Sequence, residues 1–403
     1  MTDSTEHTLH TPGDLIANLP AVFGFFPEDS LVLAAFLDDG VRFALGPVLR
    51  VDLRPVDAEA VESALGSLGA YRAGDGRVIA AFVITADAAE RDRVCELLFA
   101  ASRAGDVDLL GCWSAEGVLA GGSYELEFCP PGAEPLDDWY GGRIPEVVAA
   151  AAMAPLLRRG ELPEPDREAA LEFFAPLAGR EIDDVAPGAA AGTRAVGAVA
   201  GTRAVGGGAP VAGPAGVLDD VVLAAAAERA RGLAAAMRRG GAAGRAAYGA
   251  VVGAAERALD AVSQGRGLVR GSFFEDLVCL AGALGETHLR DAVAATVLDH
   301  PEAAERVLAV LVRVLSGEAR ANALCLYSLV AGPAGHGHRV AAALAVARTE
   351  FPAHRLTRLL SEAQLRCGPE VVAERVRRGS RQVAERLGVA GADPAGGIDG
   401  LAA

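Results

Sequence analysis

The sequence predicts an α/β domain with a mixed sheet and flanking helices, followed by an all-α domain. Three observations support this prediction. Strand-like apolar runs alternate with helix-length segments in residues 1–178, a Gly- and Ala-rich segment fills residues 179–216, and only helical segments follow over residues 217–388. Residues 389–403 are expected to form a flexible tail.

The α/β part begins with a short helix that ends at Gly24, followed by a hairpin whose turn is Asp38-Asp39-Gly40. The hairpin is antiparallel, whereas strands joined by helices favour parallel pairing, so a mixed sheet is expected. The expected elements are strands Leu31–Leu37 and Val41–Leu53, helix Ala58–Ala70, strand Val78–Thr85, helix Ala88–Ala104, strand Val107–Trp113, a hairpin arm Gly117–Glu127, and helices Ile144–Arg159 and Pro165–Ala178. Val78–Thr85 is continuously apolar, which is typical of a strand buried on both faces.

A nine-residue unit rich in Gly and Ala occurs twice in the central segment, at Gly192–Ala200 and Gly201–Ala209. Such a composition cannot bury a core, so this segment is interpreted as a flexible linker between the two parts.

The second part is predicted to be helical because Gly and Pro fall between its apolar segments, where helix ends are expected. The expected helices are Val217–Arg239, Ala243–Ser263, Phe273–Leu284, His288–Leu298, Pro301–Leu315, Ala319–Ala331, His338–Thr349, His354–Arg366 and Pro369–Leu387. Short connections between them predict antiparallel pairs, arranged either as a plain bundle or as tetratricopeptide-like repeats.

The charge of the chain excludes several classes of function. All 37 basic residues are Arg, so a phosphate-binding lysine of the Walker type, a Schiff-base lysine and a Ser–Lys dyad are all excluded. The whole chain carries a net charge of −16, and residues 1–178 alone carry −18. This acidic part repels phosphate backbones, so no nucleic-acid partner is expected.

The apolar segments and the cysteines point to a cytoplasmic protein. No apolar stretch reaches the ~18 residues that a membrane span needs, and the N-terminus lacks the pattern of a secretory signal, so no membrane association is expected. The six cysteines lie at least 17 residues apart, which excludes a CxxC zinc clip. They are interpreted as reduced, structural thiols, and neither a metal nor a cofactor is predicted.

The candidate binding residues are Asp29, Ser30, Arg50 and Asp52. Asp29 and Ser30 follow Pro27 in a polar turn that leaves a helix and enters a strand, the reverse of a phosphate-binding loop. Arg50 and Asp52 are two residues apart on a strand, so they share one face. Each pair has a structural interpretation, a turn for Asp29 and Ser30 and an ion pair for Arg50 and Asp52. The alternative is that the residues form the polar part of a ligand site.

The α/β part offers no histidine that could act as a general base, because no histidine lies between Thr11 and Thr287. His336 and His338 are expected at the exposed start of a helix, without enough neighbouring ligands for a metal. Carboxylate-only chemistry remains as an alternative, with four aspartates as the candidate oxygen ligands: Asp29, Asp52, Asp137 and Asp138.

Four large aromatic residues, Trp113, Tyr124, Trp139 and Tyr140, are grouped around Cys129-Pro130-Pro131 in a chain with few aromatic residues. They mark either a ligand groove or protein-contact patch, or a hairpin packed on the sheet.

Two regions resemble an actinobacterial family grouped as domain of unknown function 4192. The family's Gly-Phe-x-Pro-x-Asp-Ser turn is similar to Gly24–Ser30, and its Arg-x-Asp pair to Arg50 and Asp52. A later Ser-Tyr…Cys-Pro-Pro motif is similar to Ser123–Pro131, where this chain keeps only Cys129 of the motif's cysteines. The resemblance implies a common lineage and assigns no activity.

Taken together, the sequence predicts a non-enzymatic binding, scaffold or regulatory protein that contacts another protein through its helical domain, since helical pairs present extended surfaces. The alternative is a metabolite-binding protein or a carboxylate-dependent enzyme that uses the α/β domain.

Overall fold

The computed structural model describes residues 8–38, 43–54, 56–69, 77–104, 109–130, 137–177, 218, 220–266 and 274–389. The predicted linker, residues 39–40 of the predicted hairpin turn, and the predicted tail from residue 390 on lie outside the described residues. The described chain forms two compact units. Unit 1 contains Met1–Ala175 and Ala331–Val372, and unit 2 contains Gly208–Val330 and the chain from Ala373 on.

The predicted fold class is confirmed: unit 1 contains a mixed sheet of six strands in the order β2-β1-β3-β4-β5-β6. Its strands are β1 (Ser30–Asp38), β2 (Phe43–Asp52), β3 (Arg77–Ile84), β4 (Leu109–Ala115), β5 (Ser123–Phe128) and β6 (Gly141–Arg143). β3 and β4 are parallel, and the other neighbouring pairs are antiparallel. Ser30, the first residue of β1, therefore pairs with the last residue of β2, Asp52, and with the last residue of β3, Ile84.

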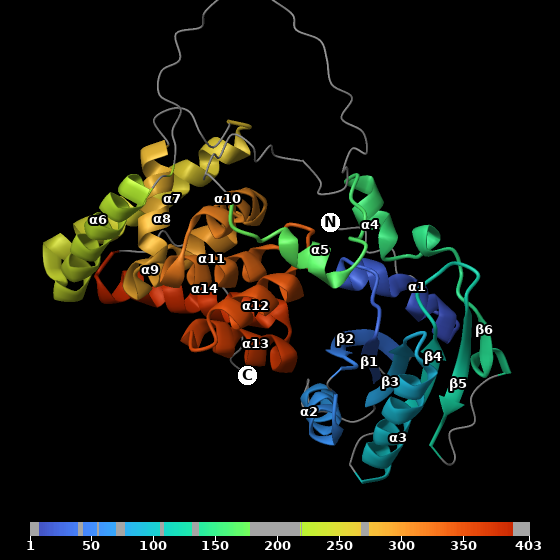
Figure 1. Ribbon diagram of the computed structural model, residues 1–403. Coiled ribbons are helices and arrows are strands. Elements are labelled where there is room, and N and C mark those ends of the chain that lie inside the picture. Colours follow the sequence, from blue (N-terminus) through green and yellow to red (C-terminus); the bar gives the residue numbers. More distant parts are fainter. Residues whose placement is uncertain are drawn as a thin grey trace, which may run out of the picture. The chain divides into compact units, whose positions relative to one another are not determined.

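Helices cover both faces of this sheet (Figure 1). On one face, Leu15, Ile16 and Leu19 of α1 (Pro12–Phe23) pack against even-numbered residues of the central strands, such as Val32 and Phe82. The other face takes α2 (Ala58–Gly69) and α3 (Ala88–Ala104), which pack on odd-numbered residues of β1 and β3. β1 and β3 are buried on both faces, and this explains their continuous apolar sequences.

Two predicted helices are much shorter than expected. In place of Ile144–Arg159 the structure has a 3₁₀ turn, η2 (Val147–Ala149), and α4 (Met153–Arg158). In place of Pro165–Ala178 it has only α5 (Arg167–Glu172). Pro155 and Pro176 explain the difference. A proline lacks a backbone N–H and restricts the residue before it to extended conformations. A second 3₁₀ turn, η1 (Asp137–Trp139), precedes β6, and neither element was expected.

Unit 1 also includes helices from far along the chain: α12 (His338–Glu350) packs on α1 and α5, and α13 (Arg355–Cys367) packs on α2. The sequence-based division placed these two helices with the helical part.

Unit 2 is helical, as predicted. It contains α6 (Asp220–Arg239), α7 (Gly241–Ser263), α8 (Phe274–Leu284), α9 (Thr287–Asp299), α10 (Pro301–Val314), α11 (Gly317–Val330) and most of α14 (Pro369–Arg386). Every residue of α11 from Arg320 to Val330 is buried, so α11 forms the centre of this unit. Its polar side chains have buried partners: the Asn322 amide donates to the Leu284 carbonyl at 2.8 Å, and the Tyr327 hydroxyl donates to Glu305 at 2.7 Å.

No helix in the described ranges is long and apolar enough to cross a membrane.

Candidate functional site

The four residues that the sequence analysis selected lie together at one end of the sheet, where β1 begins and β2 and β3 end. Three of them are in direct contact. The Arg50 Nε–H donates to the Ser30 hydroxyl oxygen at 2.7 Å, and Arg50 Nη2 lies 2.6 Å from the Asp52 carboxylate. The pairing of Ser30 with Asp52 and of Val32 with Arg50 aligns these side chains on the α1 face.

Asp29 belongs to the same end of the sheet but contacts other partners. Its φ of 40° lies in the left-handed region, which Asp tolerates better than most residues. This conformation lets its carbonyl accept from the Leu53 N–H at 2.9 Å, while its carboxylate accepts from the Thr85 hydroxyl at 2.7 Å. Asp29 therefore ties the turn before β1 to the ends of β2 and β3.

Within the polar cluster of Asp29, Ser30, Arg50, Asp52 and Thr85, the charge of Arg50 is compensated by Asp52. Burial lowers the pKa of the Arg50 guanidinium, and the neighbouring Asp52 opposes that shift. Only 13% of the Arg50 side chain is exposed. Because a buried guanidinium needs a partner, the ion pair and the Ser30 hydroxyl explain how Arg50 is held here.

Thr85 is a member of the cluster that sequence reasoning missed. It is buried and follows β3 directly, and its backbone N–H donates to the Ala115 carbonyl at 2.9 Å. The sequence did contain a signal for Thr85, which is a polar residue at the carboxyl end of a buried parallel strand. Ligands of α/β folds bind at such strand ends.

A second polar cluster surrounds Glu161. The Glu161 carboxylate lies 2.9 Å from His336 Nε2, 3.1 Å from Arg159 Nε and 3.6 Å from Arg339 Nη2. Burial alone would raise the pKa of Glu161, but His336 and the two guanidiniums outweigh it and lower this pKa to about 2. The carboxylate is therefore held in its charged form by its neighbours.

The expectation that His336 and His338 are exposed is wrong. His336 contacts Glu161, and only 17% of its side chain is exposed. His338, the first residue of α12, lies against Gly24, where a Cβ would come within 2.7 Å of the His338 ring. Burial, followed by the charge of Arg339, lowers the pKa of His338 to about 4. Sequence reasoning missed this because the neighbours of both histidines come from distant parts of the chain.

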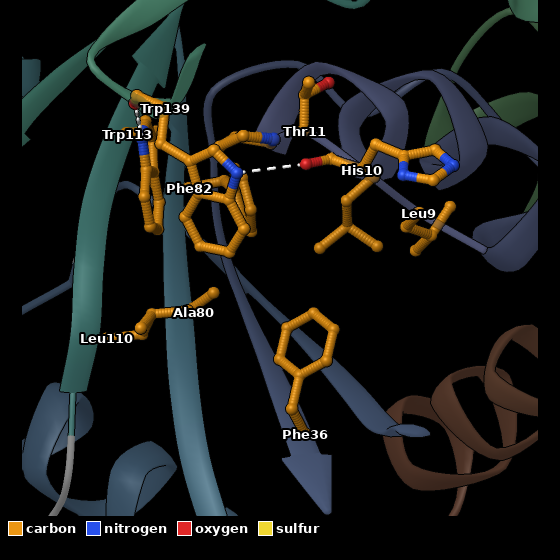
Figure 2. A pocket seen from close by; sticks show the side chains of 11 residues that line it. Leu9, His10, Thr11, Phe36, Ala80, Phe82, Leu110, Trp113 and Trp139 are labelled. Atoms are coloured by element: carbon orange, nitrogen blue, oxygen red, sulfur yellow. Dashed lines mark hydrogen bonds between the residues drawn. The ribbon is translucent and has the colours of Figure 1, made fainter. Parts of the chain in front are cut away.

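An aromatic pocket opens on the α1 face of the sheet, toward the end away from the first polar cluster (Figure 2). It is open to solvent, and its hollow amounts to about 350 Å³ when the open solvent at its mouth is included. Four rings belong to its walls: Phe36 of β1, Phe82 of β3, Trp113 of β4, and Trp139 of η1. These are residues of four different elements, and pairing along β1, β3 and β4 brings three of them together.

The rings of the pocket are held in fixed orientations. The Phe82 and Trp113 rings are stacked, with centroids 5.6 Å apart and planes 24° from parallel. The Trp139 ring stands at 72° to the Trp113 ring at 5.9 Å. The Trp113 indole N–H donates to the Trp139 carbonyl at 2.7 Å, and the Trp139 indole N–H donates to the His10 carbonyl at 3.0 Å. Both tryptophans of the protein are therefore part of this pocket.

The wall opposite the sheet is the segment Leu9–Thr11, which enters α1. The Asp14 carboxylate accepts from the backbone N–H groups of His10 and Thr11, both at 2.9 Å. The Thr11 hydroxyl in turn accepts from the Asp14 N–H, which completes a capping box. This helix cap fixes the conformation of the segment beside the pocket.

The aromatic group that the sequence singled out is divided by the structure. Trp113 and Tyr124 are buried in the core, Trp139 is half-buried at the pocket, and Tyr140 is exposed. Among the described residues, no group of three or more His, Cys, Asp or Glu side chains is arranged to hold a metal ion. The side chain of Asp137, one of the four candidate aspartates, lies outside the described residues.

The comparisons with known proteins give one match. The family model for "Domain of unknown function (DUF4192)" matches residues 12–370. No curated protein and no solved structure matches the chain. The matched range includes the whole polar cluster, the helices α12 and α13, and all residues of the aromatic pocket except those of the segment Leu9–Thr11. The chain therefore belongs to the family described as domain of unknown function DUF4192.

Proposed function

We propose that the protein is a non-enzymatic binding protein whose α/β unit takes a small apolar molecule into the aromatic pocket. The observation that carries this proposal is the lining of the pocket, in which four aromatic rings and the segment Leu9–Thr11 surround an open hollow. Small-molecule sites are typically concave and lined mainly by apolar and aromatic side chains. The pocket has both features.

The polar cluster supports binding over catalysis. A catalytic acid or base needs to be within hydrogen-bond reach of a substrate proton. Here the Asp29 carboxylate accepts from Thr85, and the Asp52 carboxylate lies 2.6 Å from Arg50 and 3.8 Å from Arg167. These contacts join strand ends to one another, so the cluster is proposed to stabilise the sheet.

We propose a cytoplasmic location for this function. The six cysteines, all of which lie among the described residues, form no disulfide, and the sulfur atoms of Cys95 and Cys112 lie 3.9 Å apart. Free thiols that close together fit a reducing compartment.

The experiment that tests the proposal is native mass spectrometry of the full chain, purified gently at low salt from its own host. We expect a reproducible adduct of small-molecule mass on the 41.0 kDa chain. The variant Ala80→Leu should lose the adduct, because Ala80 lines the pocket and a leucine there fills it.

The matched control is Ala58→Leu, which adds the same atoms at an exposed position of α2 and should keep the adduct. An adduct that survives Ala80→Leu lies elsewhere and would contradict the proposal. A second polypeptide in place of a small adduct would favour the other function that the sequence predicts, a protein partner bound by the helical part.

A further inference from the structure

Four donor groups of the pocket wall are already engaged in hydrogen bonds. The indole N–H groups of Trp113 and Trp139 donate to backbone carbonyls, and the backbone N–H groups of His10 and Thr11 donate to Asp14. A ligand that needs a hydrogen bond from one of these donors would have to break an existing bond or leave its own polar group unpaired. Either loss costs about 1–3 kcal/mol in a dehydrated site.

The charged side chains next to the lining residues are acidic. The Asp14 carboxylate accepts from two backbone N–H groups in the first turn of α1, and Asp138, which precedes Trp139, is exposed. The His10 side chain is exposed and points away from the space between the rings (Figure 2). A negatively charged ligand would therefore lose its hydration without gaining an ion pair.

The shape of the pocket comes from one small residue among large ones. Ala80 of β3 leaves a hollow in the sheet face, and the rings of Phe36 and Trp139 lie on different sides of it (Figure 2). Leu9 and Leu110 complete the apolar lining. Aromatic rings prefer offset-stacked or edge-to-face partners, and the Phe82, Trp113 and Trp139 rings already adopt both arrangements with one another.

From this geometry we infer that the ligand is a planar aromatic molecule of one or two fused rings that carries no negative charge and continues the array of rings in the pocket wall. The inference rests on the proposed function and names the chemical class that the same pocket selects. The hollow sets an upper limit of size, because even with open solvent included it amounts to only about 350 Å³, which is near the lower end for small-molecule sites.

The test uses the two tryptophans as reporters, since both line the pocket and the chain has no others. The probe is 1-naphthylamine, a neutral two-ring amine that absorbs where tryptophan emits, so its binding is measured by energy transfer from Trp113 and Trp139. Two matched compounds test the inference. 5-Aminonaphthalene-1-sulfonate adds a negative charge to the same rings, and decahydro-1-naphthol, used as a competitor, keeps the size but is not planar.

We expect saturable energy transfer to 1-naphthylamine, at least tenfold weaker binding of the sulfonate, and at least tenfold weaker competition by decahydro-1-naphthol. The variant Phe36→Leu keeps an apolar side chain without a ring and should weaken binding of 1-naphthylamine about threefold to tenfold, the range for one aromatic contact. The control Phe99→Leu removes a partly exposed ring from α3, on the other face of the sheet, and should leave binding unchanged.

Two results would overturn the inference, and they separate it from the proposed function. Equal binding of the sulfonate or equal competition by decahydro-1-naphthol would show an apolar pocket without selectivity for planar rings that carry no negative charge, so the inference fails while the proposed function survives. If neither compound binds to the unaltered chain, 1-naphthylamine followed by energy transfer and decahydro-1-naphthol by the change in tryptophan emission, both fail. These comparisons use the unaltered chain, so they hold even if a variant does not fold.

Discussion

The burial of His338 predicts that unit 1 loses stability as the pH falls below neutrality. His338 packs against Gly24, with Arg339 beside it and with Glu161, His336 and Arg159 as the other charged or titratable groups that affect it. Its pKa falls from an ordinary value of 6.5 to about 4 in the folded chain. The unfolded chain therefore binds a proton more readily, and the stability contributed by neutral His338 is fully present above pH 6.5 and is lost as the pH falls toward 4.

The size of the effect follows from the difference between the two pKa values. A difference of about 2.5 pKa units corresponds to a maximum of about 3.4 kcal/mol of unfolding free energy. Most of this appears early: between pH 7 and pH 5 the linkage relation gives a loss of about 2 kcal/mol. Glu161, whose pKa is lowered to about 2, contributes stability that is lost only as the pH falls below about 4.5 toward 2, so the two effects occupy different pH windows.

The assay is urea unfolding followed by tryptophan fluorescence at pH 7, 6 and 5. Both tryptophans belong to unit 1, so this signal reports that unit. The variant His338→Gln lacks the protonatable group. Its free energy of unfolding should therefore fall by about 2 kcal/mol less than that of the parent chain between pH 7 and pH 5, whatever the stability of the variant at pH 7. The exposed His10 provides the control His10→Gln, which should retain the dependence of the parent chain.

Equal pH dependence in the parent chain and in His338→Gln would refute the reasoning. So would an NMR titration of the His338 ring in the folded protein with a midpoint near 6.5, because the ring would then be protonated without cost.

Three further predictions concern single contacts of unit 1. Gly24→Ala should reduce the free energy of unfolding by about 2 kcal/mol in urea unfolding, because Gly24 has a φ of 80° and its new Cβ would meet the His338 ring at 2.7 Å. Arg50→Ala should cost about 2 kcal/mol by the same measurement, since it leaves the Ser30 hydroxyl and the Asp52 carboxylate without their partner. Cys95 and Cys112 should resist iodoacetamide in the folded protein and react after unfolding, as read by peptide mass mapping, because both thiols are buried and the pKa of Cys112 is raised by its contact with Cys95 and by burial.

Matched controls distinguish these effects from a general loss of stability. Gly66→Ala places a methyl group in open space within α2 and should be neutral or stabilising. Arg158→Ala removes an exposed guanidinium and should change stability by less than about 0.5 kcal/mol. If either control costs as much as its partner, the named contact does not explain the loss. Rapid alkylation of Cys95 in the folded chain would contradict its burial between α3 and the sheet.

The sheet and the helical unit could be predicted from local sequence because their signals are local. Continuous apolar runs identified β1 and β3, and Gly and Pro between apolar segments identified the helix ends of unit 2. The same local reasoning overextended the helices around α4 and α5. There alanines and leucines have high helix propensity, but Pro155 and Pro176 limit the helical hydrogen bonds.

The candidate sites were predictable only in part, because their contacts join distant segments. Ser30 and Arg50, whose numbers differ by 20, could be related through the hairpin that pairs β1 with β2. Glu161 and His336 are far apart in the chain, and no local pattern indicates that pair. Likewise, Trp113 and Trp139 were noticed as a group, but the pocket also depends on Phe36 and Ala80, whose apolar character fits any buried strand.

The discontinuity of unit 1 has a consequence for synthesis on the ribosome. The strands of its sheet are complete by Arg143, whereas α12, which packs on α1, begins at His338. At ~5–20 residues per second, the nascent sheet waits roughly 10–40 s for that helix to emerge. During this interval the apolar surface that α12 later covers stays in contact with solvent, and a chaperone that recognises such surface has its longest opportunity to bind before the second unit is finished.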